Sequence, residues 1–348
     1  MTVNAARIDG PGYSILEDAS LAGRNTLRVD ARAALLVDVR DAAALPEALA
    51  FPWIRNAPLL VVGEGSNLLL TRDFPGVVLA PSMRGIAAID DDGEHGIVRA
   101  QAGESWNDLV LWTLGRGYAG LENLVLIPGA VGAAPIQNIG AYGVELAEFV
   151  HAVDAYDRMN GIPVRFANAD CAFGYRDSRF KREPDRYVVT ALELRLPRRR
   201  ALRLDYAGVR EELASMGVAE PTPSLVAEAV SRLRRRKLPD PAAIGNAGSF
   251  FKNPIVSNAQ ADALASEHAG LPRWPAGDAT KLSAAWLIEQ SGLKGARDGD
   301  AGISERHALV LVNHGRATGA DLWAFAQRVQ LEVRERFGVA LEAEPRVV

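Results

Sequence analysis

A sixteen-residue stretch without a single charge constrains the fold of this chain more than any other segment. It reads PGAVGAAPIQNIGAYG over residues 128–143 and contains four glycines and four alanines. So little side-chain bulk allows the backbone to approach a neighbouring group closely. One interpretation is a closely packed loop that crosses between two lobes, which is the favoured one for a generic glycine–alanine segment. The other is a surface that contacts a ligand that is large and flat or highly charged.

A second glycine-rich turn lies in VVGEGSNLLL, residues 61–70. A strand followed by such a turn is the usual geometry of sites in which backbone N–H groups bind a phosphate. The turn is not a full dinucleotide fingerprint, because Leu68 stands at the position of the third glycine and an apolar run replaces the helix. A tight structural turn is therefore as well supported as a phosphate site. Two such loops in one chain favour a nucleotide cofactor, and the absence of the P-loop lysine signature disfavours ATP chemistry.

Composition and charge exclude several classes of protein. The 348 residues are 48% hydrophobic and 24% charged, as in a globular protein of two or three domains. A formal net charge of -4 argues against a general nucleic-acid binder. The single cysteine, Cys171, excludes an internal disulfide and a thiolate zinc cluster, and it fits a cytoplasmic protein. We expect no signal peptide and no membrane span, since residues 124–136 fall short of the about 20 apolar residues required.

Short apolar runs and helical periodicities predict an α+β chain. Strands are expected at 35–39, 59–62, 77–80, 96–103 and 308–313, with another within 196–209. Helices are expected at 43–54 and 105–117, from Pro223 to just before Pro239, and from Thr318 onward. Asp321 completes a capping box with Thr318, and the apolar face that follows is Leu322, Phe325, Val329 and Val333.

Several polar motifs each allow two interpretations. FGYRDSRFK, residues 173–181, is a solvated turn, or it holds Arg176 between aromatic neighbours and aims it at a developing anion. GNAGSFFKNP, residues 245–254, only superficially resembles a nucleophile elbow, because Phe251 stands two residues after Ser249, so a serine hydrolase is disfavoured. The basic run at 232–237 is a solvated helix end or a pyrophosphate site. Glu344, considered alone, is a surface carboxylate.

Taken in order, these motifs resemble those of a known family. The set is GEGSN, IPGAVGAAPIQNIGAYG, FGYRDS, KLPDP, GNAGSFFKNP, KLSAAWLIEQSGLKG, HALVLVN and LEAEPR. The chain resembles the UDP-N-acetylenolpyruvoylglucosamine reductases, also called UDP-N-acetylmuramate dehydrogenases, which are flavoenzymes of peptidoglycan precursor synthesis. The resemblance implies a two-lobed FAD-binding domain of the vanillyl-alcohol-oxidase (PCMH) type, with lobes at 1–85 and 86–222. A C-terminal α+β substrate-binding domain would occupy 223–348.

The resemblance also implies a reaction. NADPH reduces a non-covalently bound FAD, and N5 of the reduced flavin then delivers hydride to the enolpyruvyl methylene carbon, which yields UDP-N-acetylmuramate. Arg176 and Glu344 correspond to the residues that stabilise the resulting negative charge, and Ser249 corresponds to the proton donor. No metal is implied.

The binding residues implied by the resemblance fall into two sets. Those expected to surround FAD are Gly63, Gly65, Ser66, Asn67, Gly129, Gly132, Gln137, Asn138, Gly140, Ala141 and Tyr142. Those expected to bind the nucleotide sugar are Tyr206, Lys237, Asn253 and His307. Tyr206 matches the tyrosine of a loop that folds over the nucleotide in the long form of the enzyme, whereas the short C-terminal tail of some members is missing. We expect a monomer without nucleic-acid or membrane partners.

Two alternatives remain open at this point. Another oxidoreductase of the same flavin fold would act on a different alcohol or enol ether, would consume oxygen and would not depend on the UDP group. A noncatalytic nucleotide-sugar binding protein would keep both glycine-rich loops but would have no turnover.

Overall fold

The computed structural model describes residues 6–348. The chain divides into two compact units: unit 1 comprises the residues up to Ala19, Ala33–Glu64 and Pro75–Arg234, and unit 2 comprises Ser20–Arg32, Gly65–Phe74 and Arg235–Val348. The division falls inside helix α6 (Pro223–Lys237), whereas the sequence places a domain boundary just before this helix. The difference arises because Val226, Val230 and Leu233 of α6 pack into the core of unit 1.

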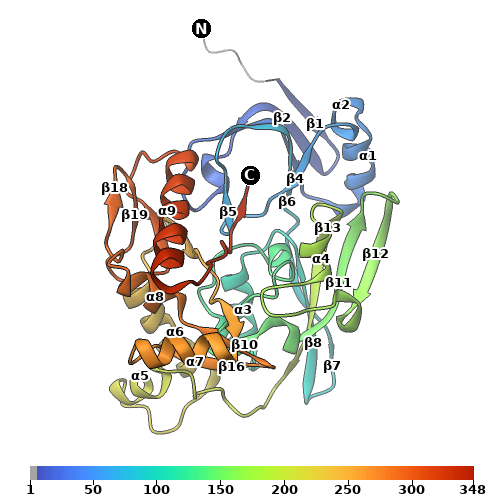
Figure 1. Ribbon diagram of the computed structural model, residues 1–348. Helices are drawn as coiled ribbons and strands as arrows, with labels where there is room; N and C mark the ends of the chain where they lie inside the picture. The colour runs from blue at the N-terminus through green and yellow to red at the C-terminus, as the bar shows by residue number, and fades with distance from the viewer. Residues whose placement is uncertain (1–5) are drawn as a thin grey trace. The chain divides into compact units, whose positions relative to one another are not determined.

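Unit 1 contains a first five-stranded sheet and two short helices (Figure 1). The strand order is β1 (Arg7–Gly10), β2 (Tyr13–Ser20), β3 (Arg32–Val39), β6 (Phe74–Pro81) and β4 (Leu59–Val61). The predicted helix at 43–54 is divided into α1 (Leu45–Ala50) and α2 (Pro52–Arg55), because the residue before a proline disfavours helical backbone. Leu45 and Ile54 are buried against the sheet together with Val37 and Val39.

A second, antiparallel five-stranded sheet also belongs to unit 1. Its order is β12 (Ile162–Ala167), β11 (Val150–Asp157), β13 (Tyr187–Pro197), β8 (His95–Gln101) and β7 (Ile86–Asp91). The helices of this part are α3 (Trp106–Leu114), α4 (Arg179–Arg182), α5 (Val209–Ser215) and α6. The strands of the first sheet lie within residues 7–81 and those of the second within 86–197, on either side of the predicted division between the two lobes.

One predicted strand of unit 1 is absent. The sequence predicts a strand within 196–209, but β13 ends at Pro197 and the chain that follows pairs with no other strand. The carbonyl of Arg203 instead accepts a hydrogen bond from the Asn123 side chain at 2.9 Å. Leu202 and Leu204 still pack against the core, which explains the strand-like pattern.

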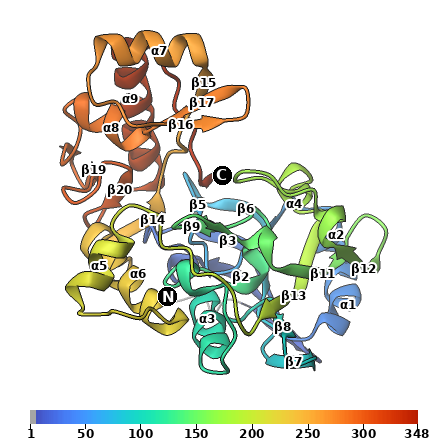
Figure 2. The same cartoon turned by 90° about the horizontal axis from the view of Figure 1, so that it is seen from below.

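Unit 2 contains a four-stranded, a three-stranded and a two-stranded sheet together with helices α7 (Asn258–Glu267), α8 (Ala284–Gln290) and α9 (Gly319–Phe337) (Figure 2). The four-stranded sheet has the order β14 (Gly245–Ser249), β20 (Val310–Asn313), β19 (Ala301–Ile303) and β18 (Arg297–Asp298). The three-stranded sheet has the order β15 (Ile255–Ser257), β17 (Ala279–Leu282) and β16 (Arg273–Ala276). Helix α9 packs against β19 and β20.

Helix α9 confirms the predicted capping box and apolar face. Thr318 Oγ1 accepts a hydrogen bond from Asp321 N at 3.2 Å, and Asp321 Oδ2 accepts one from Thr318 N at 2.9 Å. The Thr318 hydroxyl also donates to Asp321 Oδ2 at 2.7 Å, and this bond, together with the one from Thr318 N, lowers the pKa of Asp321. Leu322, Phe325 and Val329 are buried, as the periodicity indicates.

The single thiol lies in the core of unit 1. Cys171 is 0% exposed, and burial raises the pKa of its thiol to about 12. Because the thiolate is the reactive form, this cysteine is chemically inert in the folded protein.

No helix among residues 6–348 has both the length and the apolar character needed to cross a membrane.

Replacing Thr318 by alanine should lower the free energy of unfolding by about 1 kcal/mol, because the first turn of α9 loses its side-chain cap. Denaturant unfolding followed by circular dichroism measures this change. Thr318→Ser is the matched control and should retain most of the stability. Equal stability of the alanine variant and the original protein would show that the cap contributes nothing.

Candidate active site

Ser249 lies at the end of β14, next to an irregularity in the pairing of this strand with β20. Asn246 shapes this segment: its Nδ2 donates to Pro239 O at 3.1 Å, and its Oδ1 accepts from Gly248 N at 3.0 Å. The KLPDP and GNAGSFFKNP motifs are thereby joined. Ser249 is half-buried, and its hydroxyl makes no hydrogen bond with the described residues. The hydroxyl is therefore available to a ligand.

The backbone of Glu344 runs beside the residue that follows Ser249. Glu344 N donates to Phe250 O at 2.8 Å, and Phe251 forms an antiparallel bridge with Ala343. The rings of Phe250 and Phe251 are buried and lie 5.2 Å apart between centroids. Two of the three predicted catalytic residues are thus brought close together along the backbone of unit 2.

The second half of the GEGSN motif adjoins Glu344 in the same unit. Asn67 Nδ2 donates to Glu344 O at 3.3 Å, and Asn67 O accepts from Arg346 N at 3.0 Å. These contacts accompany a parallel pairing of β5 (Leu68–Leu69) with β21 (Arg346–Val347). Ser66 and Asn67, both predicted FAD contacts, therefore lie in the segment beside the backbone of Glu344, a predicted catalytic residue.

Gly65 has a structural reason to be glycine. Its φ is +65°, and a Cβ at this position would lie 1.9 Å from Arg24 O. Its carbonyl also accepts a hydrogen bond from Thr26 N at 3.3 Å. For this residue the structural-turn interpretation of the motif explains the missing side chain.

The predicted substrate residues of unit 2 form a second group. Burial lowers the pKa of His307, and the positive charges of Lys237 and Lys294 lower it further, so Lys237 and His307 share one electrostatic environment. Lys237 is exposed at the end of α6. Asn253 Oδ1 accepts from Ala284 N at 3.0 Å, at the start of α8, and its Nδ2 has no partner among the described residues.

Arg176, the third predicted catalytic residue, contacts the 128–143 stretch within unit 1. Its Nη2 donates to Gly140 O at 2.8 Å, and its guanidinium carbon lies 5.5 Å from the centre of the Tyr175 ring. The residue is half-buried and has a φ of +52°. Arg176 therefore lies beside an aromatic ring, and its role toward a developing anion stays a prediction.

Close packing explains part of the small-residue composition of the 128–143 stretch. A Cβ on Gly132 would lie 2.7 Å from the Cβ of Ala102, and Gly132 N donates to Ala102 O at 2.8 Å. Gly63, from the other glycine-rich loop, packs on Ala130 in the same manner, since a Cβ on Gly63 would lie 3.1 Å from the alanine Cβ. The two predicted FAD loops therefore meet at Gly63 and Ala130.

Asn138 holds the centre of this stretch in place. It is 1% exposed and has a φ of +45°. Its Nδ2 donates to Glu145 Oε2 at 2.9 Å and to Gly174 O at 3.0 Å, and its Oδ1 accepts from Ala147 N at 2.9 Å. The side chain is committed to protein partners, so a contact of Asn138 with FAD would have to use its backbone.

The 128–143 stretch ends in a tight hairpin. This hairpin brings a predicted FAD contact, Tyr142, against the predicted substrate residue Tyr206. Tyr142 lies between β9 (Gly140–Ala141) and β10 (Val144–Glu145), and its ring meets that of Tyr206 edge to face at 4.9 Å. Asn123 donates to Tyr142 O at 3.0 Å as well as to the loop that leads to Tyr206. Asn123 was not predicted, since nothing in its local sequence distinguishes it.

The other predicted FAD contacts lie on the same stretch. Gly129 accepts a hydrogen bond from Trp106 N at 2.9 Å, Gln137 is half-buried, and Ala141 ends β9. The roles of these three residues toward FAD stay predictions.

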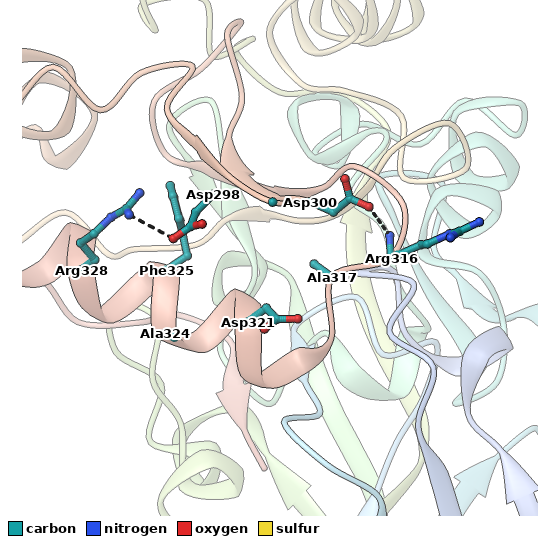
Figure 3. Close-up of a pocket in the computed structure, with 9 residues that line it drawn as sticks. Asp298, Asp300, Arg316, Ala317, Asp321, Ala324, Phe325 and Arg328 are labelled. Atoms are coloured by element: carbon teal, nitrogen blue, oxygen red, sulfur yellow. Dashed lines mark hydrogen bonds and ion pairs between the residues drawn. The ribbon is translucent and has the colours of Figure 1, made fainter.

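A pocket of about 560 Å³ lies elsewhere in unit 2 (Figure 3). It is lined by Asp298, Gly299, Asp300, Arg316, Ala317, Asp321, Ala324, Phe325 and Arg328. Asp298 pairs with Arg328 at 3.2 Å, and Asp300 accepts from Arg316 N at 2.8 Å. No predicted site residue lines the pocket. Across residues 6–348, no group of three or more histidine, cysteine or acidic side chains could hold a metal ion.

Comparison with known proteins first defines the class. Residues 33–167 match the family model of an FAD binding domain, and this range contains the 128–143 stretch and Gly63. Residues 240–348 match the model of the UDP-N-acetylenolpyruvoylglucosamine reductase C-terminal domain. The protein is a flavin-dependent oxidoreductase with an α+β fold of the predicted PCMH type.

Full-length relatives then identify the family. The chain is 55% identical over 339 residues to UDP-N-acetylenolpyruvoylglucosamine reductase of Xanthomonas euvesicatoria pv. vesicatoria, with 97% of each chain covered. It is 55% identical over 338 residues to the enzyme of the same name from Xanthomonas campestris pv. campestris, again with 97% of each chain covered. The crystal structure of the Thermus caldophilus enzyme matches with a TM-score of 0.65 and 27% identity, over 99% of this chain and 98% of that one. The chain belongs to the UDP-N-acetylenolpyruvoylglucosamine reductase family, whose reaction serves peptidoglycan precursor synthesis.

The residues of unit 1 fit an FAD. The 128–143 stretch carries no acidic side chain that would repel a diphosphate, and Ala133, Ile136 and Ala141 on it remain partly accessible. The half-buried cation Arg176 adjoins it. Asn123 Oδ1, in the same unit, is a buried acceptor without a partner among the described residues.

Replacing Asn138 by alanine should destabilise unit 1 by about 2 kcal/mol, because buried hydrogen-bonding groups lose their partners. It should also weaken FAD retention, because the backbone of the 128–143 stretch loses its anchor. Thermal unfolding and flavin release on dilution measure the two effects. Exposed Asn56→Ala, in the same unit, is the control and should change neither. Unchanged thermal stability and flavin release in Asn138→Ala would show that Asn138 does not anchor the 128–143 stretch.

Proposed function

We propose that the protein reduces UDP-N-acetylglucosamine enolpyruvate to UDP-N-acetylmuramate with NADPH as electron donor. Family membership supports the substrate, and one observation carries the chemistry. The hydroxyl of Ser249 is half-buried, makes no hydrogen bond with the described residues, and lies on a segment bonded to the backbone of Glu344. The fold therefore positions this hydroxyl, and no described residue uses its hydrogen-bonding capacity.

Non-covalently bound FAD, once reduced by NADPH, would supply a hydride from N5 to the methylene carbon of the enolpyruvyl group, and the FAD would be held by the 128–143 stretch of unit 1. The electron pair of the carbon–carbon double bond then moves to the carbon that bears the carboxylate. Negative charge therefore develops on that carbon and on the carboxylate oxygens.

Arg176 stabilises this developing charge. A guanidinium remains protonated throughout the accessible pH range, and it presents a planar set of donors that matches a carboxylate. The hydrogen bond to Gly140 O and the ring of Tyr175 fix its direction before the substrate arrives. Preorganised donors of this kind act without reorganisation at the moment of reaction.

Ser249 completes the reaction by protonating the carbanionic carbon. The O–H bond of Ser249 breaks, a carbon–hydrogen bond forms, and solvent returns a proton to the alkoxide. An alcohol is a weak acid, but an adjacent carbanion is basic enough to remove its proton. Glu344, in its protonated form, would donate a hydrogen bond to the substrate carboxylate and share the developing charge with Arg176.

The remaining predicted residues bind the nucleotide sugar. Lys237, whose charge acts on His307, provides positive potential for the diphosphate. Asn253 offers a free amide donor beside α8. Tyr206 is 50% exposed on a loop tied down by Asn123, as expected for a side chain that covers a ligand in the long form of the enzyme. We further propose a cytoplasmic monomer without nucleic-acid or membrane partners.

Replacing Ser249 by alanine should abolish product formation while leaving flavin reduction by NADPH intact, because only the second half-reaction needs the proton. Anaerobic absorbance at the flavin band follows both steps, and reoxidation by substrate should slow by a factor of about 100 or more. Exposed Ser266→Ala, in the same unit, is the control and should behave as the original protein.

The unmodified protein decides between the proposal and its alternatives in the same experiment. Flavin that NADPH reduces and the substrate reoxidises supports the proposal. Flavin that stays reduced until oxygen is admitted indicates a different substrate. Nucleotide-sugar binding without either half-reaction indicates a noncatalytic protein.

A further inference from the structure

The basic run at the end of α6 contains one residue that differs from the others. Arg232, Arg235, Arg236 and Lys237 are exposed, as expected for a solvated helix end. Arg234 is half-buried, since Val230 and Ser231, four and three residues earlier, lie on the buried face of the helix. The helical register therefore turns Arg234 alone toward the interior of unit 1.

Arg234 has no anionic partner there. It makes no hydrogen bond and no ion pair with the described residues, whereas Arg232 on the same helix bonds to Glu228 at 2.7 Å. Burial lowers the pKa of the Arg234 guanidinium, and the opposing electrostatic interaction comes from the phenol of Tyr142. A cation that has lost water without gaining an anion is costly, and partners normally compensate for it.

The end of α6 lies near two predicted ligand residues of unit 1, Tyr142 and Tyr206, and Tyr142 interacts electrostatically with Arg234. Leu233, the preceding residue, lies in the core against which Tyr142 packs. A Cβ on Gly208, which follows Tyr206 by two residues, would lie 3.4 Å from Leu233 Cδ2. Since the Tyr142 and Tyr206 rings touch, the end of α6 adjoins the place where the FAD stretch and the substrate loop meet.

We propose that Arg234 binds an anionic oxygen of a ligand held by unit 1, through charge-assisted hydrogen bonds. The inference rests on the proposed function, because FAD and the nucleotide sugar both bring diphosphate oxygens, and the sugar also brings a carboxylate. Arg234 suits this role because its planar guanidinium carries five donors, none of which is engaged by the described residues. Folding has already removed part of the water around the guanidinium. Less desolvation free energy therefore opposes the attraction between Arg234 and an anionic ligand when the ligand binds.

The test compares Arg234→Met with Arg235→Met, an exposed neighbour of the same type. FAD binding to the full-length apoprotein is followed by flavin fluorescence, and binding of UDP-N-acetylglucosamine enolpyruvate to the FAD-loaded protein is followed by calorimetry. Arg234→Met should weaken one of the two affinities by a factor of about 10 or more, and Arg235→Met should change each by less than about twofold. Loss of FAD affinity identifies FAD as the source of the oxygen, and loss of substrate affinity identifies the nucleotide sugar.

A stability measurement separates binding from a structural role. Removing a desolvated, unpaired charge should leave the Tm of the Arg234→Met apoprotein equal to that of the original or higher. Arg234→Lys should recover part of the lost affinity, since it restores the charge. A lower Tm that falls together with both affinities and is not rescued by lysine would overturn the proposal.

Two further outcomes are decisive. Unchanged affinities for both ligands in Arg234→Met would overturn the role of Arg234 while the Ser249 experiment still supported the reductase reaction. Failure of the unmodified protein to bind either ligand would instead contradict the proposed function. If Arg234→Met does not fold, Arg234→Gln replaces it with the same expectations, because its amide keeps a polar group at a half-buried position.

Discussion

Backbone hydrogen bonds from residues 342–347 hold the candidate catalytic groups of unit 2 together. Lys252 N donates to Glu342 O at 2.9 Å, and Glu344 N donates to the carbonyl of the residue after Ser249. On the other side, β21 pairs with β5, directly after the GEGSN turn. Glu344 therefore lies between two segments that are far from it in sequence. The backbone of Glu344 is held in place because the chain around it is paired on both sides.

Unit 1 reaches a similar result by different means. Its candidate site is formed by loops with few ladder hydrogen bonds, so buried asparagine side chains satisfy the backbone instead. Asn138 fixes the small-residue stretch, and Asn123 joins the Tyr142 hairpin to the chain that leads to Tyr206. Arg176 adds a third connection through Gly140 O. Rigid support of this kind is what a site needs when its contact surface consists largely of backbone and methyl groups.

Local patterns in the sequence were sufficient wherever the structure depends on neighbours along the chain. The capping box of α9 and its apolar face were predicted correctly, as were the strands β3, β6 and β8 and the helix α3. Long-range contacts could not be predicted from the sequence. The pairing of β5 with β21, the contact of Gly65 with Arg24, and the hydrogen bonds of Asn138 all depend on tertiary structure. The register of α6 follows from the sequence, because Arg234 lies four residues after Val230, but the pattern of the basic run alone does not distinguish Arg234 from its exposed neighbours.

Cys171 has a practical consequence for work on the substrate loop. Because it is the only cysteine in the sequence and is both buried and held in its protonated form, the folded chain offers an almost unreactive background for maleimide chemistry. A single cysteine introduced on the exposed loop around Tyr206 would then be labelled selectively without first removing the native thiol. A fluorophore placed there would report movement of the loop during turnover, in a protein whose interior had not been altered.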